Sequence, residues 1–168
     1  MVRKIDTMTQ GMFVLGHVGI GRRLVGSRGR RLPTVPLVVG MVLPDLIDKP
    51  LYYWHFSEFI SCTRTFGHTG LLLALVCAVA ASRKSAAWLA VGLGMSTHLL
   101  LDWTLDVIFS KDISAEAIAF AWPFWYTHFL TYDVTPLEHL GFIFRGPILT
   151  GEIVGLSLLV WEYVRRRR

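Results

Sequence analysis

Apolar residues are concentrated in five segments of the chain, separated by polar or basic stretches. The three clearest segments are residues 70–82, 86–109 and 147–164, and two shorter, glycine-bearing segments precede them at 9–21 and 34–47. A membrane-spanning helix needs about 20 mostly apolar residues, although shorter ones occur inside bundles. The pattern predicts an all-α, integral membrane helical bundle that occupies the whole chain, 1–168, as a single domain. It leaves open whether the first two segments cross the bilayer fully.

The composition also favours a lipid environment. Hydrophobic residues make up 53% of the chain and charged residues only 17%, whereas a soluble domain typically has about 25% charged residues. The polar N-terminal residues are not followed by a cleavage motif, so we expect the membrane segments to be permanent. Membrane lipid is the expected partner and environment, with no nucleic acid. The oligomeric state stays open.

The placement of basic residues predicts an orientation. Three stretches, at 22–31, 82–84 and 165–168, contain 11 of the 17 lysine and arginine residues. Five alternating segments would put all three stretches on one side, which the positive-inside rule assigns to the cytoplasm. The C-terminus of this cell-membrane protein is then cytoplasmic. The aromatic-rich loops at 48–67 and 111–146 face outward.

Several ionisable residues interrupt the apolar segments or stand at their ends. Such groups are costly at membrane depth and usually serve a function. His98 and Asp102 are four positions apart and share one helix face, and Asp106 extends that face by a turn. Imidazole and carboxylate on one face make a good metal-ligand pair. The full set is His17, Asp45, Asp48, His68, His98, Asp102, Asp106 and Glu152.

In the five-segment arrangement these groups gather at one level, in the outer half of the bundle. Carboxylates that share an apolar pocket repel each other and become protonated unless a cation joins them. The sequence therefore predicts a site for one or two divalent metal ions, with zinc the leading candidate. The alternative is a purely structural role, in which buried His–Asp hydrogen bonds stabilise the bundle.

The motifs "LPDLIDKP", "RTFGHT" and "HLLLD", together with the N-terminal "GH" and a later "WPF", resemble the membrane-bound metal-dependent hydrolase family, the YdjM-like proteins. The resemblance extends from about His17 to Pro123. The family is distantly similar to zinc-dependent phospholipase C and nuclease P1, which are helical enzymes with histidine and aspartate metal clusters. The resemblance implies metal-dependent hydrolysis of a phosphoester.

Carried over residue by residue, the resemblance implies that His17, Asp45, His68, His98 and Asp102 are metal ligands. Asp48 departs from the commonest family spacing, because two residues rather than one separate the aspartates. It is expected to be a ligand, a group behind the ligands, or the general base.

The predicted mechanism is hydrolysis by metal-activated water. Asp48 or Asp106 would accept the proton of the water. Arg64 would clamp the phosphate at the lipid surface, or else be an interfacial arginine with no such role. The leading substrate class is a phospholipid or a lipid-linked phosphate. The alternatives are a membrane metal-ion transporter and a non-enzymatic membrane scaffold.

Some residues have no settled role at the level of sequence. The functions of His55, His128, His139 and Glu152 stay open. Thr65 or Thr69 is expected to cap the helix that follows His68, and Gly67 and Gly70 are expected to allow a close approach of the backbone to the site.

Overall fold

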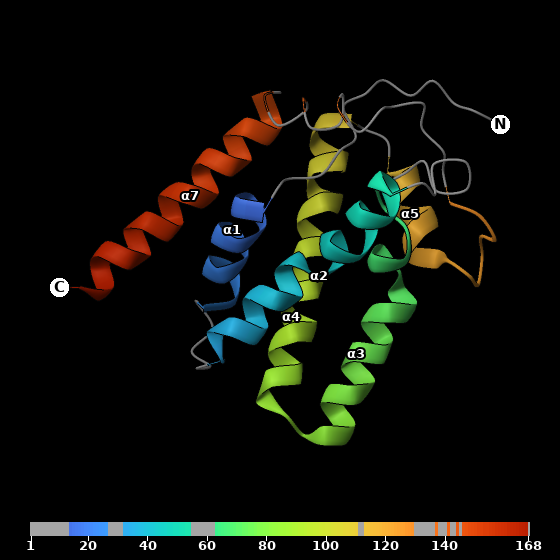
Figure 1. Ribbon diagram of the computed structural model, residues 1–168, viewed down its shortest axis with the longest axis horizontal. Helices are drawn as coiled ribbons and strands as arrows, with labels where there is room; N and C mark the ends of the chain where they lie inside the picture. Colours follow the sequence, from blue (N-terminus) through green and yellow to red (C-terminus); the bar gives the residue numbers. More distant parts are fainter. Residues whose placement is uncertain are drawn as a thin grey trace.

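The structure is a computed structural model that describes residues 14–26, 32–54, 63–110, 113–129, 137, 141, 144 and 146–167. The described residues contain helices and no strand, which confirms the predicted all-α class. The elements, shown in Figure 1, are α1 (Val14–Gly26), α2 (Thr34–Tyr53), the 3₁₀ turn η1 (Phe66–His68), α3 (Gly70–Arg83), α4 (Ala86–Leu105), the π-helical turn η2 (Asp106–Ser110), α5 (Ser114–Ala121) and α7 (Gly146–Arg166).

Three of the predicted segments coincide closely with observed helices. These are α3, α7, and α4 with its π-helical extension η2. In contrast, α2 continues beyond residue 47, through the internal Pro50, and therefore includes Asp48. Helix α5 lies inside the segment that was predicted as an outer loop. Residues 9–13 of the first predicted segment lie outside the described part of the chain, as do His55 and His139.

The structure does not support the predicted five-span bundle. Among the described helices, α7 is the one that is long and apolar enough to cross a membrane. Its 21 residues extend over about 31 Å, which matches a hydrocarbon core of about 30 Å. Helices α1 and α3 have 13 and 14 residues and are too short. Helices α2 and α4 have 20 residues each, but buried ionisable groups interrupt both of them.

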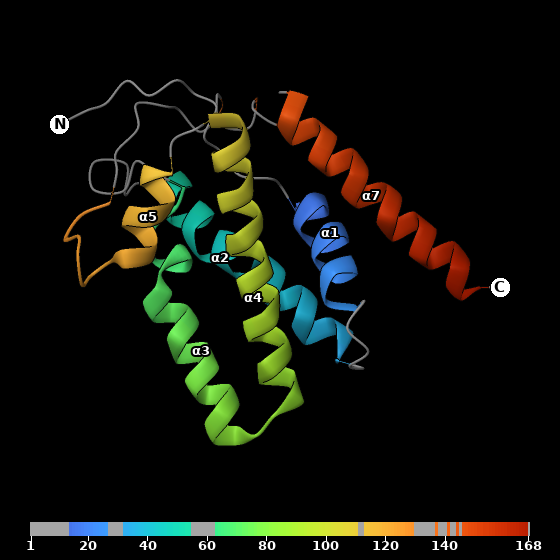
Figure 2. The same ribbon diagram turned by 180° about the vertical axis from the view of Figure 1, so that it is seen from behind.

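Helix α4 is the centre of the arrangement. Helix α2 packs across it and makes with it the most extensive interface among the described elements, and α3 and α4 form a hairpin (Figures 1 and 2). One apolar cluster, around Met41 and Ala90, joins α1, α2 and α4. A second, around Val76 and Met95, joins α3 to α4. Helices α1, α2 and α3 are thus held against α4 by apolar packing, and η1 contacts α2.

The start of α3 is set by a cap. The hydroxyl of Thr69 accepts a hydrogen bond from the backbone N–H of Leu72, at 3.1 Å, which satisfies one of the free donors of the first turn. Thr69 is therefore the capping residue rather than Thr65. Gly67 is close-packed: a Cβ at this position would lie 2.3 Å from the carbonyl oxygen of Pro44 in α2. This close approach places His68 directly against α2.

Helices α1 and α7 are joined by a glycine contact and a carboxylate cap. A Cβ on Gly19 would lie 2.1 Å from the carbonyl oxygen of Gly155. About one turn closer to the N-terminus of α1, Glu152 accepts hydrogen bonds from the backbone N–H groups of Leu15, at 3.1 Å, and Gly16, at 2.8 Å. Because these donors have no partner within the helix and carry partial positive charge, a buried carboxylate is favourable here. Glu152, whose role the sequence left open, is the cap of α1.

We predict that Gly155→Ala will loosen the α1–α7 interface. The added methyl group would lie 2.2 Å from the backbone oxygen of Leu15, so the helices must move apart, at a cost of about 1–3 kcal/mol. Gly26→Ala is the matched control, because a Cβ there meets nothing within 4 Å. Thermal unfolding in detergent should show a lower midpoint for the first variant only. Equal midpoints for the two variants would contradict the close contact.

Candidate metal site

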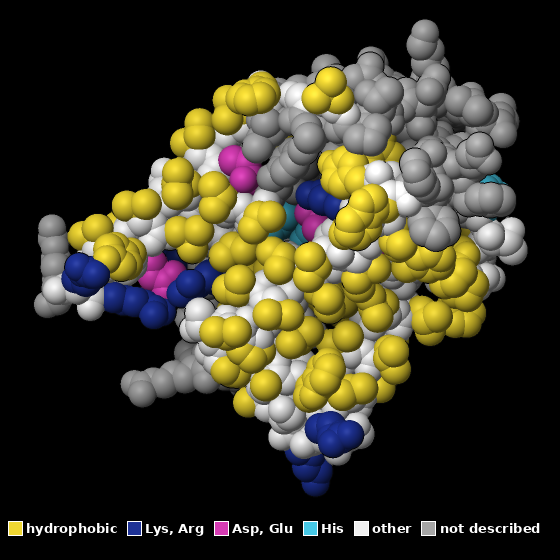
Figure 3. All heavy atoms as spheres, viewed as in Figure 1, with side chains coloured by type: hydrophobic (Ala, Val, Ile, Leu, Met, Phe, Trp, Pro, Cys, Tyr) yellow, Lys and Arg dark blue, Asp and Glu magenta, His cyan; other side chains and the backbone are white. Residues whose placement is uncertain are grey.

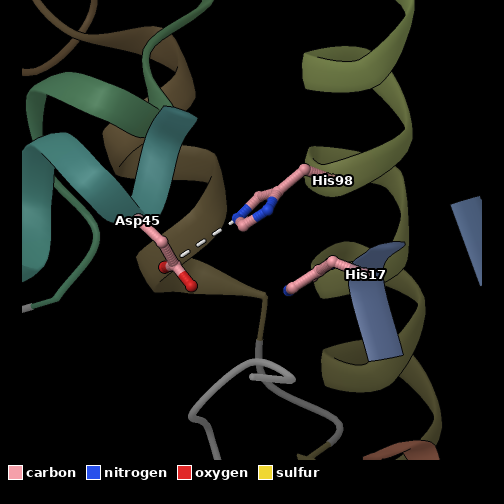
Figure 4. Close-up of side chains that lie close together, drawn as sticks. All are labelled: His17, Asp45 and His98. Atoms are coloured by element: carbon pink, nitrogen blue, oxygen red, sulfur yellow. Dashed lines mark ion pairs between the residues drawn. The ribbon is translucent and has the colours of Figure 1, made fainter. Parts of the chain in front are cut away.

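Side chains from four elements meet beside α4. His17 comes from α1, Asp45 from α2 and His68 from η1, and α4 itself contributes His98 and Asp102. Each of these residues is at most 9% exposed. Figure 4 shows three of them converging from different helices, with Asp45 and His98 pointing toward each other. The structure therefore brings together five of the six residues that were predicted as ligands.

The donor atoms of His68, His98 and Asp102 are spaced as metal ligands are. Nε2 of His68 lies 3.2 Å from Nε2 of His98. Oδ2 of Asp102 lies 3.4 Å from the first of these nitrogens and 3.5 Å from the second. Tetrahedral zinc with bonds of about 2.0–2.1 Å requires ligand atoms about 3.3 Å apart. These three atoms form one face of such a tetrahedron.

Two of the histidines are oriented by oxygen acceptors at Nδ1, the ring nitrogen that points away from the three-atom face. Nδ1 of His68 lies 2.7 Å from Oδ2 of Asp48, and Nδ1 of His98 lies 2.7 Å from the carbonyl oxygen of Met41. An oxygen acceptor at Nδ1 keeps the proton on that nitrogen and leaves the lone pair of Nε2 for a metal. Metal-binding histidines usually have such a partner. The hydrogen bonds of the cluster thus favour ligation through Nε2.

Asp48 does not lie among the ligand atoms. Its two oxygens accept hydrogen bonds from the backbone N–H of Thr65 at 2.6 Å, the hydroxyl of Thr65 at 2.8 Å and the backbone N–H of Gly67 at 2.7 Å, besides the contact with His68. These partners occupy both oxygens. The sequence left three roles open for Asp48: a ligand, a group behind the ligands, or the general base. The geometry supports the second role, in which Asp48 holds His68 in place. Neither oxygen of Asp48 is free to bind a metal or to accept the proton of a water.

His17 and Asp45 lie at the edge of the three-atom face. Nε2 of His17 is 3.3 Å from Oδ1 of Asp102, and the ring of His17 stacks on that of His98 with centroids 3.8 Å apart. Oδ1 of Asp45 is 3.9 Å from Nε2 of His98, while Oδ2 of Asp45 is held by Lys49 at 2.5 Å. With His98 these two residues make a second group that can hold an ion. Because Nε2 of His98 has one lone pair, the two groups cannot hold separate ions through it.

Three buried atoms of the cluster form no hydrogen bond among the described residues, although two of them, Nε2 of His17 and Oδ1 of Asp102, lie 3.3 Å apart. These are both ring nitrogens of His17 and Oδ1 of Asp102. Buried polar atoms are nearly always hydrogen-bonded, and an exception in a native protein indicates a missing ligand or a functional group. Nitrogen from imidazole and oxygen from carboxylate are the donors that zinc and similar divalent ions bind. The residues therefore fit a divalent metal.

Arg64 is at the centre of a second buried network, directly behind Asp102. It is 3% exposed, and its guanidinium contacts Asp106 at 2.5 Å, Glu116 at 2.5 Å and Asp102 at 3.8 Å. Burial alone would lower the pKa of Arg64, but the charges of Glu116, Asp102 and Asp106 raise it well above its usual value. The predicted place of Arg64 at the lipid surface is wrong, because three buried carboxylates hold its side chain inside the protein.

Glu116 belongs to this network and escaped the sequence analysis. It is fully buried on α5, and burial raises its pKa to about 7, with Asp102 and Asp106 adding to the effect and Arg64 opposing it. A single glutamate within the apolar stretch "SAEAIAF" was the signal available. Asp106, predicted as a catalytic base, contacts Arg64 through both of its oxygens, at 2.5 and 3.5 Å.

The site has an excess of negative charge. Five carboxylates, on Asp45, Asp48, Asp102, Asp106 and Glu116, are buried. Two permanent cations, Lys49 and Arg64, pair with members of this set, so the ionised carboxylates outnumber these cations even when Glu116, with its pKa of about 7, is protonated. Burial alone would lower the pKa of His68, but its hydrogen bonds with Asp102 and Asp48 and the charge of Glu116 raise it to about 10. A proton and a metal ion therefore compete for this histidine.

No protein-family model, no curated protein and no solved structure matches the chain. The resemblance to membrane-bound metal-dependent hydrolases accordingly stays a prediction, and the functional argument depends on the site. Of the remaining candidates, His128 is exposed and Glu152 caps α1.

We predict that the purified protein binds one zinc ion per chain. His98→Ala and Asp102→Ala each remove a donor atom of the three-atom face and should abolish binding. Asp48→Asn removes the group that orients His68 and should weaken binding about 10–100-fold. Elemental analysis and competition with a zinc chelator measure these effects. His128→Ala is the control and should bind as the unmodified protein does. Two ions per chain would show that His17 and Asp45 serve a second ion.

We predict that Arg64→Ala destabilises the fold. The change leaves the carboxylates of Asp106 and Glu116 buried without their cation, which typically costs about 3–5 kcal/mol. Arg166→Ala is the matched control, because it removes an arginine–carboxylate pair whose arginine is 64% exposed, and such a pair contributes about 0–1 kcal/mol. Denaturant unfolding in detergent measures both. A stable Arg64→Ala protein that loses turnover alone would instead favour the phosphate-clamp role.

Proposed function

We propose that the protein is a membrane-associated, metal-dependent hydrolase that cleaves a phosphoester of a phospholipid or a lipid-linked phosphate. The observation that carries the proposal is the three-atom face formed by His68, His98 and Asp102, with separations of 3.2–3.5 Å. Catalytic zinc sites typically have three protein ligands and one open position. Here the remaining side is bordered by His17 and by the carboxylate of Asp45, whose Oδ1 lies 3.9 Å from Nε2 of His98.

The outer surface supports a lipid environment. Large apolar side chains are exposed on several helices, among them Leu46 (65%), Leu75 (59%) and Leu100 (59%), while the interior contains charged groups. Contiguous apolar surface of this kind indicates a membrane or protein interaction site. Helix α7 is long and apolar enough to span a bilayer. Together these features favour an enzyme that meets its substrate at the membrane.

The site is reached from that apolar surface. Figure 3 shows acidic, basic and histidine side chains at one place on this face, with hydrophobic side chains beside them. Asp45 is the most exposed member of the cluster, at 9%, and its partner Lys49 is half-buried beside it. A substrate with an apolar tail and an anionic head group suits polar side chains that have apolar side chains beside them.

The proposed mechanism assigns a task to each group around the opening. His68, His98 and Asp102 would hold a divalent metal, which would supply Lewis acidity and lower the pKa of a water molecule toward neutrality. Oδ1 of Asp45 takes up the proton of the attacking water, since Lys49 holds the other oxygen and fixes the carboxylate. The ammonium group of Lys49 attracts the phosphate. Arg64 keeps Asp102 ionised and in place from behind.

The competing transporter function receives less support from the packing. Transport requires polar groups at successive depths of a path across the bilayer. Below the cluster, the described residues form the apolar groups around Met41 with Ala90 and around Val76 with Met95. These side chains close the interior on that side. The buried ionisable residues of the cluster therefore do not continue through these apolar groups.

We predict that the zinc-loaded protein in lipid nanodiscs releases a phosphorylated head group or inorganic phosphate from a panel of phospholipids. Asp45→Asn should keep the metal and lower turnover about 10²–10⁴-fold, because it removes the proton acceptor. Lys49→Ala should raise KM more than it lowers kcat. Mass spectrometry of the lipids and a phosphate assay measure the products. His128→Ala is the control.

Two results would contradict this proposal. Loss of metal in Asp45→Asn would make Asp45 a ligand rather than the proton acceptor. Zinc flux into proteoliposomes by a metal-loaded protein that hydrolyses no phosphoester would favour transport.

A further inference from the structure

A second polar site lies between α1 and α7, away from the metal cluster. A cavity of about 450 Å³ opens between the C-terminal parts of the two helices. Its lining includes Leu158 and Gly19, and Gly19 makes the glycine contact that joins the helices. Its walls carry four arginines and one glutamate: Arg22, Arg23, Arg165, Arg166 and Glu162. None of these residues belongs to the metal cluster.

The arginines are held in two pairs. Oε1 of Glu162 accepts hydrogen bonds from Arg22 at 2.7 Å and from Arg166 at 2.6 Å, so one carboxylate oxygen positions one guanidinium from each helix. Arg23 and Arg165 lie over the ring of Trp161, with distances to the ring centroid of 4.9 and 5.3 Å. Cation–π contacts of this kind orient a guanidinium and leave its N–H donors available. Neither Arg23 nor Arg165 has a carboxylate partner among the described residues.

The charge of the cavity favours an anion. Four arginines against one glutamate leave a formal charge of +3. The two helix C-termini that end here each contribute about −0.5, so a net positive charge of about two remains. Guanidinium groups match the oxygens of a phosphate in a planar, bidentate geometry. The chemistry of the walls therefore corresponds to a phosphate group.

The surroundings favour a lipid over a free ion. The cavity lies at the arginine-rich end of α7, the helix that is long enough to span a bilayer. Its lining includes the apolar Leu158, and Trp161, 45% exposed, has the amphipathic character typical of the membrane interface. Basic pockets between membrane helices commonly bind anionic head groups. We propose that the cavity between α1 and α7 binds the phosphate head group of an anionic phospholipid.

The test is native mass spectrometry of the detergent-purified protein with added phosphatidylglycerol or phosphatidylcholine. The protein should retain phosphatidylglycerol in preference. Arg23→Gln combined with Arg165→Gln should weaken this binding roughly 30-fold, from about two arginine contacts at a membrane surface. Arg83→Gln combined with Lys84→Gln is the matched control, because it removes the same charge at the exposed turn between α3 and α4. That variant should bind as the unmodified protein does.

Three results would overturn the assignment. Equal losses in the two double variants would show general attraction to basic charge rather than a site. Equal retention of phosphatidylcholine would remove the role of the anionic head group. Displacement of the lipid by millimolar inorganic phosphate would identify a site for the free ion. Zinc content and helical content of both variants establish that the fold is intact, so a failure here is separate from any failure of the proposed hydrolase activity.

Discussion

The carboxylate of Asp48 is the interaction on which the site depends. Its oxygens receive hydrogen bonds from Thr65 and Gly67 and contact His68, which ties the segment before α3 onto α2. The same contact turns Nε2 of His68 toward His98 and Asp102. A fully buried carboxylate is stable because four partners replace its hydration. These hydrogen bonds fix the position of the 3₁₀ turn and, through it, the position of His68 in the three-atom face.

The two buried networks depend on each other through Asp102. Both oxygens of this residue face histidines, and Oδ2 also lies 3.8 Å from Nε of Arg64, which contacts Asp106 and Glu116 as well. Arg64 is a permanent cation beside a cluster that could hold a metal ion. Such a fixed cation limits repulsion among the carboxylates without occupying a donor atom of the histidines. The arrangement explains how so many acidic groups share one interior.

Many ionisable side chains are buried and many large apolar side chains are exposed, whereas a water-soluble bundle typically has the reverse arrangement. The acidic and histidine groups are inside, around α4, whereas leucine, valine and tryptophan side chains cover much of the outside. Close helix contacts are made by glycines, at Gly19 with Gly155 between α1 and α7. Both features are expected where lipid rather than water surrounds the helices, because small residues allow backbones to approach and polar groups must find partners internally. They fit the lipid-directed roles proposed for the metal cluster and for the arginine-lined cavity.

The sequence by itself determined the helical class, the bounds of α3, α4 and α7 to within a few residues, and the pairing of His98 with Asp102. These features follow from local periodicity, in which apolar runs and a four-residue spacing are visible along the chain. Only the tertiary structure decided that Asp48 lies behind His68, that Arg64 is buried, and that Glu116 joins it from α5. Those placements depend on contacts between residues 17 to 52 positions apart. A local pattern contains no information on which distant carboxylate will neutralise a given cation, because that choice is made by the packing of helices around α4.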